Sequence, residues 1–154
     1  MNVNRSLALG VLLLGAAAVV IGAVFVGQGV TKNNQLVEAM RVEHVTIGIE
    51  GAETEGQVID SLEEAKVAGD TIREHRWGIA PTYSDLLGGG RYNPEDPQQL
   101  SYAQALNLEN YLYLAVVAFG LTQSVMASGA FMVIVGLAIS GTGLVLYRLS
   151  GQAA

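Results

Sequence analysis

Two histidines are the only imidazole side chains that this chain offers for binding a metal, haem or pigment. His75 lies in a segment with helical spacing and shares its apolar face with Ala65, Ala68 and Ile72. His44 lies where a helical pattern gives way to an alternating one. A single histidine on an apolar face is usually a packed, hydrogen-bonded side chain, and ligation is the alternative. We keep His75 and His44 as possible ligands, with the metal unknown.

Other residue types point to little chemistry. Glu50, Glu53 and Glu55 carry the oxygen ligands that Ca²⁺ prefers, but they lack EF-hand spacing, so a solvated loop is favoured. The stretch GGGR, Gly88–Arg91, lacks the strand and the GK[ST] of a phosphate loop. The chain contains no cysteine, which excludes disulfides, thiolate zinc sites and cysteine nucleophiles. We therefore expect no enzymatic activity and no cofactor.

Composition indicates a membrane protein. Of the 154 residues, 51% are hydrophobic and 14% are charged, against about 25% charged in an ordinary soluble domain. The apolar residues lie mostly towards the two ends, and nearly all the charge lies between them. The net charge of −6 argues against nucleic acid as a partner, because binding phosphates requires an excess of Lys and Arg. The expected partners are the lipid bilayer and other membrane subunits or copies of this chain.

The first apolar run, residues 6–30, has no charged residue and no proline. About 20 residues suffice to cross the hydrocarbon layer. The alternative is a cleaved signal peptide, with Arg5 as its basic start and Ala16–Ala18 near the cleavage site. The apolar part of a signal peptide is only about 7–15 residues long. The length therefore favours a retained transmembrane helix over residues 6–30.

The second apolar run, residues 111–147, is too long for one crossing, since 37 residues of helix extend roughly 55 Å. It contains no Pro, Asn or Asp at which the chain would turn back. Counting about 20 residues back from Arg148 places the transmembrane part at about 128–147. The polar triplet Thr122–Ser124 then falls at the outer water boundary. We predict a single long helix.

Charge placement predicts the topology. Arg5 precedes the first span and Arg148 follows the second, whereas all 14 acidic residues lie from Glu38 to Glu109. Residues 31–110 carry six basic residues against these 14 acidic ones, a net charge of −8. Positive residues favour the cytoplasmic side. We expect residues 1–5 and 148–154 to be cytoplasmic tails and residues 31–110 to form an extracytoplasmic cap with helix extensions.

Small residues recur every seven positions in both apolar runs. The first run has Gly15, Gly22 and Gly29, and the second has Gly129, Gly136 and Gly143, with Ser140 between the last two. A strict seven-residue spacing keeps these positions on one side of a left-handed helix pair. Small side chains let backbones approach closely, which strengthens packing in lipid. These seven residues are predicted helix-packing positions, either between the spans or between copies.

The middle segment has helix and strand patterns of its own. The first helix is expected to run on to about Arg41, and Val45–Ile49 alternates like a short strand that the segment GQVI could pair with. Ser61 and Glu64 form a capping box that opens a helix, with Gly78 as its C-cap. A single turn is expected at Pro81–Leu87.

The second long helix is predicted to begin at Ser101, which forms another capping box with Gln104. Most polar-tipped aromatic residues lie in the middle segment or at its border with the second run: Trp77, Tyr83, Tyr92, Tyr102, Tyr111 and Tyr113. Such residues suit either a contact with a partner protein or the core of a small domain. The sequence leaves these two roles open.

The stretches AGDTIREHRWG and PTYSDLL, followed by a Tyr-led helix that enters a second span, resemble a family of small bacterial two-span membrane proteins of uncertain function. The resemblance covers most of the chain in layout and implies a bacterial plasma-membrane protein. Some members carry the label aromatic ring-opening dioxygenase. Such iron chemistry uses two His and a carboxylate, so both His44 and His75 would be ligands and no further histidine would remain. We therefore set the enzymatic label aside.

Together these patterns predict a mainly α membrane protein. Two long antiparallel helices form a transmembrane hairpin, and a small α cap with a minor β element is inserted between them. The predicted function is that of a structural or accessory subunit, self-associating or part of a larger membrane complex, including an energy-transducing one. The alternative is an extracytoplasmic ligand- or metal-binding sensor module anchored by two spans.

Overall fold

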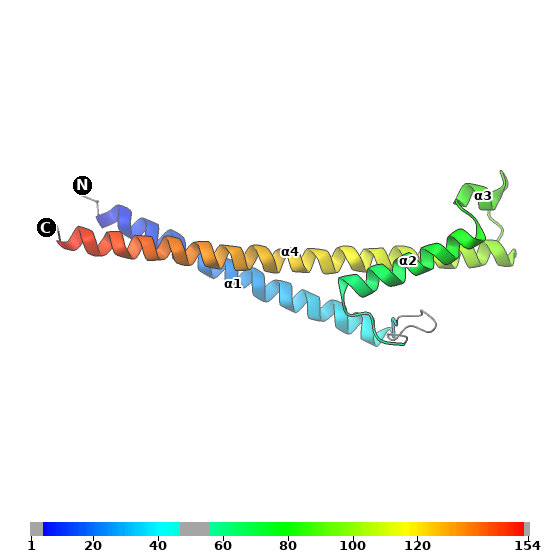
Figure 1. Cartoon of the computed structure of the whole chain (residues 1–154), viewed down its shortest axis with the longest axis horizontal. Helices are drawn as coiled ribbons and strands as arrows, with labels where there is room; N and C mark the ends of the chain where they lie inside the picture. The colour runs from blue at the N-terminus through cyan, green and yellow to red at the C-terminus, as the bar shows by residue number, and fades with distance from the viewer. Residues whose placement is uncertain (1–4, 47–55, 153–154) are drawn as a thin grey trace. The chain divides into compact units, whose positions relative to one another are not determined.

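The computed structural model describes residues 5–46 and 56–152. Its elements are α1 (Arg5–Val42), α2 (Leu62–Ile79), α3 (Tyr83–Leu87) and α4 (Pro97–Gln152), shown in Figure 1. No strand occurs within the two described ranges, so the fold is mainly α, as predicted. The chain divides into two compact units, one of Met1–Asn33 with Leu121–Ala154 and one of Asn34–Gly120. We call them the apolar unit and the polar unit.

Helices α1 and α4 are each long and apolar enough to cross a membrane. α4 continues without interruption through residues 111–147, as the absence of a turn residue predicted. A helix satisfies its backbone N–H and C=O groups internally, which is a requirement for any segment in lipid. α1 continues to Val42, one residue beyond the end expected from the sequence.

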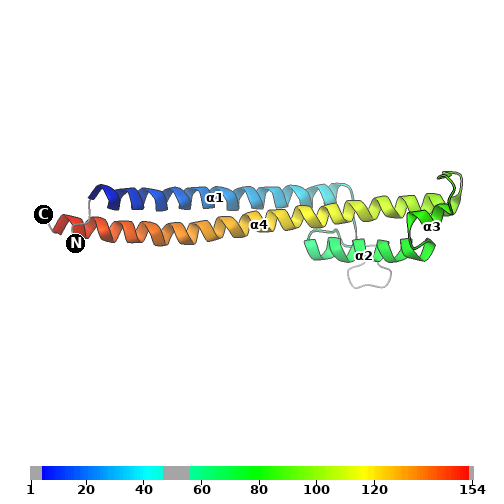
Figure 2. The same cartoon turned by 90° about the horizontal axis from the view of Figure 1, so that it is seen from above.

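In the apolar unit, the first part of α1 runs alongside the last part of α4, as Figure 2 shows. The buried residues of α1 are Ala8, Gly15, Gly22 and Gly29, each seven positions from the next. At one end of the pair, the Arg5 guanidinium donates to the Tyr147 hydroxyl at 2.6 Å. Towards the other, Thr122 donates to the Asn33 side chain at 3.2 Å. The two helices are therefore antiparallel within this unit.

In the polar unit, α2 packs against the first half of α4 around a small core of buried side chains: Ile59, Ala65, Ala68, Leu112, Ala115 and Phe119. The last two turns of α1 cover this core with Leu36, Val37 and Met40. Small alanines on α2 allow it to approach α4 closely. The core is modest in size, so polar contacts have a large share in holding α2 in place.

The predicted N-cap of α2 is confirmed. The Ser61 hydroxyl accepts from the Glu64 amide at 3.3 Å, and the Glu64 carboxylate accepts from the Asp60 amide at 2.9 Å. That hydrogen bond from Asp60 is the main reason why the pKa of Glu64 is lowered. α3 matches the single turn expected near residues 81–87, with Thr82 as its N-cap.

The predicted C-cap of α2 is wrong. Gly78 lies inside the helix, and the cap is Ala80, whose extended backbone has φ −155° and ψ 143°. The physical reason is Pro81, because a proline disfavours helical geometry in the residue before it. Ala80 still donates its amide to Arg76 at 3.1 Å, which closes the last turn.

The start of α4 also differs from the prediction. The helix begins at Pro97, one turn before Ser101. The Asp96 carboxylate accepts from the amides of Gln98 and Gln99 at 2.9 and 3.2 Å, so it caps the helix. Proline at the first helical position has no N–H to satisfy and a backbone angle that suits a helix. This Asp-Pro signal is stronger than the capping-box spacing that placed the start at Ser101.

The predicted strand is reduced to one bridge in the part of the chain that the structure describes. Thr46 pairs antiparallel with Val58, and the Ile59 amide donates to the Val45 carbonyl at 3.0 Å. The segment GQVI thus pairs where it was expected to, without forming a strand. The rest of the predicted strand lies outside the described residues, as do Glu50, Glu53 and Glu55, for which a solvated loop was favoured over a Ca²⁺ site.

Candidate functional site

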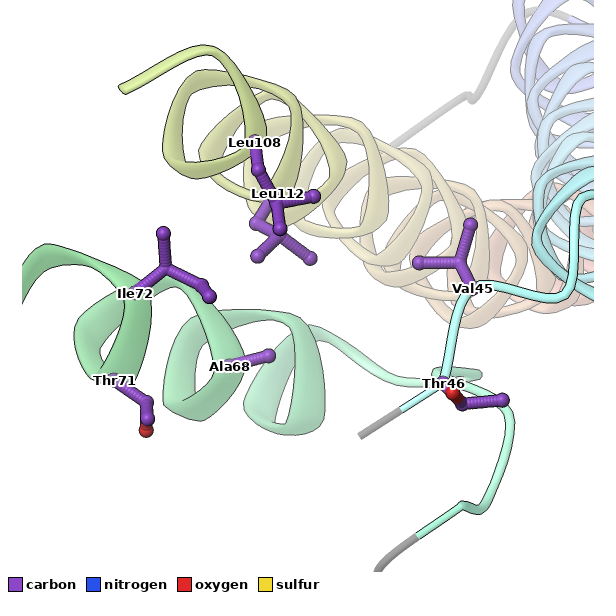
Figure 3. Close-up of a pocket in the computed structure, with 7 residues that line it drawn as sticks. All are labelled: Val45, Thr46, Ala68, Thr71, Ile72, Leu108 and Leu112. Atoms are coloured by element: carbon purple, nitrogen blue, oxygen red, sulfur yellow. The ribbon is translucent and has the colours of Figure 1, made fainter. Parts of the chain in front are cut away.

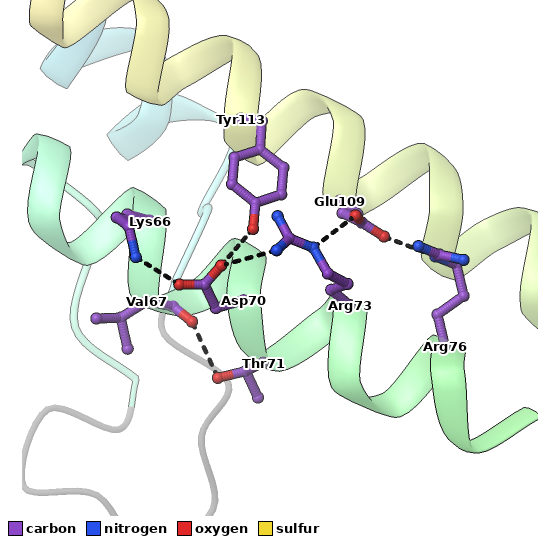
Figure 4. Close-up of polar contacts among 8 residues, drawn as sticks. All are labelled: Lys66, Val67, Asp70, Thr71, Arg73, Arg76, Glu109 and Tyr113. Carbon is purple, nitrogen blue, oxygen red and sulfur yellow. Dashed lines mark hydrogen bonds and ion pairs between the residues drawn. The ribbon is translucent and has the colours of Figure 1, made fainter. Parts of the chain in front are cut away.

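A cluster of charged and phenolic side chains joins α2 to α4 within the polar unit (Figure 4). We call it the polar cluster, and its six members are Asp70, Arg73 and Arg76 from α2 and Tyr102, Glu109 and Tyr113 from α4. Of its charged side chains, only Arg76 and Glu109 are buried, with exposed fractions of 8% and 7%. Buried charged groups are typical of functional sites, so we take the polar cluster as the candidate site.

Glu109 is held from two sides. Its Oε2 accepts from the Nε of Arg76 at 2.6 Å, and its Oε1 accepts from the Nε of Arg73 at 3.2 Å. Each carboxylate oxygen thus has its own guanidinium donor. Charge-assisted hydrogen bonds of this kind are about twice as strong as neutral ones.

Arg76 extends the cluster to a buried phenol. One of its terminal nitrogens donates to the Tyr102 hydroxyl at 2.6 Å, and its guanidinium lies 5.1 Å from the centre of the Tyr102 ring. Tyr102 is only 1% exposed, so it serves as a core residue. The Tyr83 ring lies against it at a centroid distance of 6.1 Å. In contrast, the side chains of Trp77 and Tyr111 are exposed.

Asp70 organises the more exposed end of the cluster. Its carboxylate accepts hydrogen bonds from the Lys66 ammonium at 2.7 Å and from the Tyr113 hydroxyl. Its Oδ1 also forms an ion pair with a terminal nitrogen of Arg73 at 3.6 Å. The Arg73 guanidinium sits 4.5 Å from the centre of the Tyr113 ring and 5.7 Å from that of Trp77. Arg73 therefore combines two ion pairs with two cation–π contacts.

Helical spacing places these residues opposite one another. Asp70, Arg73 and Arg76 follow at intervals of three on α2. Tyr102, Glu109 and Tyr113 follow at intervals of seven and four on α4. Such intervals bring side chains to one side of a helix. The rows meet because small residues on α2, such as Gly69 beside Leu112 and Tyr113, permit close approach.

The electrostatics make this a structural cluster. Burial by itself raises the pKa of Glu109, but the hydrogen bonds from Arg76 and Arg73 outweigh it and lower the pKa below the ordinary value of 4.5. The hydrogen bond from Lys66 likewise lowers the pKa of Asp70. A general base works best with a pKa near the operating pH. A carboxylate that is ionised, buried and bonded through both oxygens fits a clamp between helices better than a proton acceptor.

One hollow lies between α2, α4 and the segment after α1 (Figure 3). Its volume is about 100 Å³ and its lining is mostly apolar: Val45, Thr46, Ala68, Thr71, Ile72, Leu108 and Leu112. In the close-up, Ile72 of α2 and Leu112 of α4 point toward each other across it. Sites for cofactors and drug-sized ligands usually enclose about 300–1,000 Å³. This hollow is smaller than such sites.

A second, open depression of about 360 Å³ lies on the polar unit beside α4. Its polar side chains are Tyr83, Tyr92, Asn107 and Asn110. Phenol hydroxyls and amides donate and accept hydrogen bonds, and the aromatic rings offer flat apolar surface. Of the hollows described, this one has the composition of a binding site for a small polar ligand.

The prediction that His75 faces the apolar side of α2 is wrong. Its side chain is exposed, and the buried side of the helix continues through Gly69 and Arg76. His75 lies ten positions after Ala65, which is about 80° off the buried face at 100° per residue, whereas Arg76 lies close to its centre.

His44 is exposed as well, and its backbone has φ 52° where the chain leaves α1. Within residues 5–46 and 56–152, no three His, Asp or Glu side chains are grouped as a metal site. Neither histidine, kept as a possible ligand from the sequence, therefore belongs to such a group in these ranges.

The predicted helix-packing residues line the contact between α1 and α4 in the apolar unit. A Cβ atom added to Gly22 would lie 2.6 Å from the Gly129 carbonyl oxygen, and one added to Gly136 would lie 2.8 Å from that of Gly15. These separations are too short for a side chain, so glycine is sterically required.

Three further positions extend this contact, Gly29 on α1 and Ser140 and Gly143 on α4. Gly29 faces Thr122, Gly143 faces Leu12, and Ser140 donates to the Leu12 carbonyl at 3.5 Å. Val133, which the seven-residue spacing leaves off the stripe, also lies against Gly22.

Sequence reasoning missed Arg73, Arg76, Tyr102 and Glu109 as a group. One signal was available, since Glu109 is the only charged residue from Ser101 to Tyr147. An isolated acid on an otherwise uncharged helix needs a partner, and two arginines three residues apart on a neighbouring helix supply it.

No protein family, curated protein or solved structure matches this chain.

Proposed function

We propose that this chain is a two-span membrane protein with a structural role, as an accessory or scaffold subunit that associates with copies of itself or joins a larger membrane complex. Two helices long and apolar enough to cross a membrane are compatible with insertion. Most of their large apolar side chains, such as Leu14, Phe131 and Ile134, are exposed and suit contact with lipid or other helices.

The proposed topology follows the charges. Both termini are cytoplasmic, residues 31–110 are extracytoplasmic, and the two spans form an antiparallel hairpin with this segment inserted as a cap. Arg5 and Arg148 flank the spans on the cytoplasmic side, in line with the preference of positive residues for that side. By its resemblance to small bacterial two-span proteins, we assign the chain to a bacterial plasma membrane.

The observation that carries the structural role is the pairing within the polar cluster. Both oxygens of Glu109 are bonded to arginines, and Arg76 is bonded to Glu109 and Tyr102. No buried side-chain nitrogen or oxygen in the described ranges lacks a hydrogen-bond partner. The buried charges thus serve to fix α2 on α4, which is what a rigid docking module requires. For this reason we assign no enzymatic activity.

A ligand-binding sensor is the second candidate, and the depression lined by Tyr83, Tyr92, Asn107 and Asn110 favours it. A small molecule that co-purifies with the wild type and is lost in Asn107→Ala, but kept in Glu74→Gln, would establish this function. Glu74 is a suitable control because it is exposed and lies on α2.

Native purification tests the structural role directly. The wild type and His75→Gln are extracted from membranes in mild detergent, and their associated proteins, metal content and absorption spectra are measured. We expect stoichiometric association with copies or other membrane subunits, unchanged in His75→Gln because that side chain is exposed. A stoichiometric metal or chromophore that is present in the wild type and absent from His75→Gln would refute the structural role.

A further inference from the structure

One face of α4 is apolar and exposed although it belongs to the polar unit. Tyr111, Leu114 and Val117 are 62%, 64% and 65% exposed. At 100° per residue they span one side of the helix, opposite the side that buries Leu112 and Phe119 in the core. We call these three residues the outer α4 face.

Lipid does not explain this face if the chain inserts as proposed above, a premise on which the inference rests. Thr122 is bonded to Asn33, and Gly29 lies against Thr122 and Met126. The first charged residue after the apolar run of α1, Lys32, is therefore level with this part of α4. Residues 111–117 precede Thr122 by 5–11 positions, which is roughly 8–17 Å along the helix. They lie beyond the hydrocarbon layer, on the side facing water.

We infer that the outer α4 face is the surface through which two copies of this chain associate. Copies in one membrane share their orientation, so a symmetric pair brings the α4 helices together in parallel, with each residue near its own counterpart. Any charge on such a face would repel itself. α4 has no charged residue from Asn110 to Tyr147, as self-pairing requires.

The spacing also fits a parallel helix pair. Tyr111, Leu114, Ala118 and Leu121 follow at intervals of three and four, the pattern of apolar positions at two-helix seams. A charged partner of another kind would leave this uncharged face without complementary contacts.

Disulfide crosslinking in membranes tests the inference, because the chain has no cysteine of its own. Leu114→Cys should give a covalent dimer upon mild oxidation, since a symmetric pair places the two introduced thiols together. Val67→Cys is the matched control, as an exposed apolar residue of α2 in the same unit. It should remain monomeric under the same conditions. Equal crosslinking of the two variants, or none at Leu114→Cys, would overturn the inference.

A second test of self-association uses opposite charges at position 114 and does not depend on the geometry of a disulfide. Leu114→Glu and Leu114→Lys, each expressed alone, should lose self-association because like charges would face each other. Co-expressed with different affinity tags, the two variants should recover it as a mixed pair. Failure of the mixed pair, or loss of a different protein from Leu114→Glu, would refute self-pairing.

A separate measurement distinguishes this failure from that of the proposed function. Labelling Gln123→Cys and Leu137→Cys with a membrane-impermeant thiol reagent reports insertion alone, because Gln123 lies outside the outer α4 face. Labelling of the first and protection of the second would leave the membrane role standing even if self-pairing failed. Protection of Gln123→Cys would remove the premise that the outer α4 face lies beyond the lipid and would overturn the inference.

Discussion

Glu109 illustrates how one residue can hold a small domain together. Its carboxylate is 7% exposed and bridges two arginines of another helix. Taking charges out of water is costly, and the pairing offsets that cost only while all partners are present. Removing one partner leaves uncompensated charge in a buried place. The polar unit is therefore expected to be most sensitive at this position.

Replacing the carboxylate measures that sensitivity. Glu109→Gln should lower the free energy of unfolding of the polar unit by roughly 3 kcal/mol, near the low end for breaking a buried pair because Arg73 is partly exposed. Glu74→Gln, an exposed change on α2, should stay within about 0.5 kcal/mol of the wild type. Chemical denaturation in detergent, followed by tyrosine and tryptophan fluorescence, would compare them. Equal destabilisation would show that the cluster contributes nothing specific.

Acidification should act on the same residue. The pKa of Glu109 is lowered in the folded state, because the arginine hydrogen bonds outweigh the raising effect of burial. Its stabilising contribution is therefore complete above its ordinary pKa of 4.5 and is lost as the pH falls through the lowered folded value. The melting temperature of the wild type should drop below about pH 4.5.

The matched comparison is Glu109→Gln, which should show a smaller drop over the same pH range. A residual drop is expected, because the pKa values of Glu64 and Asp70 are lowered too. Parallel pH profiles of the two proteins would argue against Glu109 as the group responsible.

At the scale of the helix, the seven-residue stripe determines how closely α1 and α4 pack in the apolar unit. Lipid tails are as apolar as leucine, so helices in a membrane associate by van der Waals contact at close range. Added Cβ atoms at Gly22 and Gly136 would collide with the backbone of the other helix. The glycines that meet no neighbour within 4 Å, such as Gly27 and Gly141, have no such constraint.

This difference supplies matched controls for a packing test. Gly22→Leu should separate the helices and cost about 1–3 kcal/mol, as overpacking does in other cores. Gly27→Leu makes the same chemical change on the same helix at an open position, and it should be nearly neutral. Val133→Leu is a poor control because Val133 contacts Gly22. Thermal stability in detergent would decide, and equal losses for the two glycine variants would contradict close packing.

At the scale of the whole molecule, the sequence separates an apolar pair of helices from an acidic middle segment. All 14 acidic residues lie between Glu38 and Glu109. Charged side chains are costly at the centre of a bilayer, so the proposed topology keeps this segment on one side. In the proposed topology, the Thr122–Asn33 contact marks the level at which both helices leave the hydrocarbon layer. The remaining question about the proposed topology is on which side of the membrane the middle segment lies.

Cysteine labelling tests this topology in intact cells. Lys32→Cys and Gln123→Cys should react with a membrane-impermeant thiol reagent from outside, because the proposed topology places both at the outer water boundary. Leu137→Cys should be protected by lipid, and Ser150→Cys should react only after the cells are permeabilised. Reaction of Ser150→Cys in intact cells would place the C-terminus outside and contradict the proposed orientation.

Features that depend on local properties of the chain could be predicted from its sequence. Residues 111–147 were predictable as one helix because nothing in them turns the backbone, and the glycine spacing was readable because a helix repeats its faces regularly. Contacts between distant residues could not be predicted in this way, because they depend on how the helices pack. Glu109 is 33 positions from Arg76, and their pairing depends on which faces of α2 and α4 meet. A shift of one residue turns a side chain by 100°, which is why Arg76 is buried while its neighbour His75 is exposed.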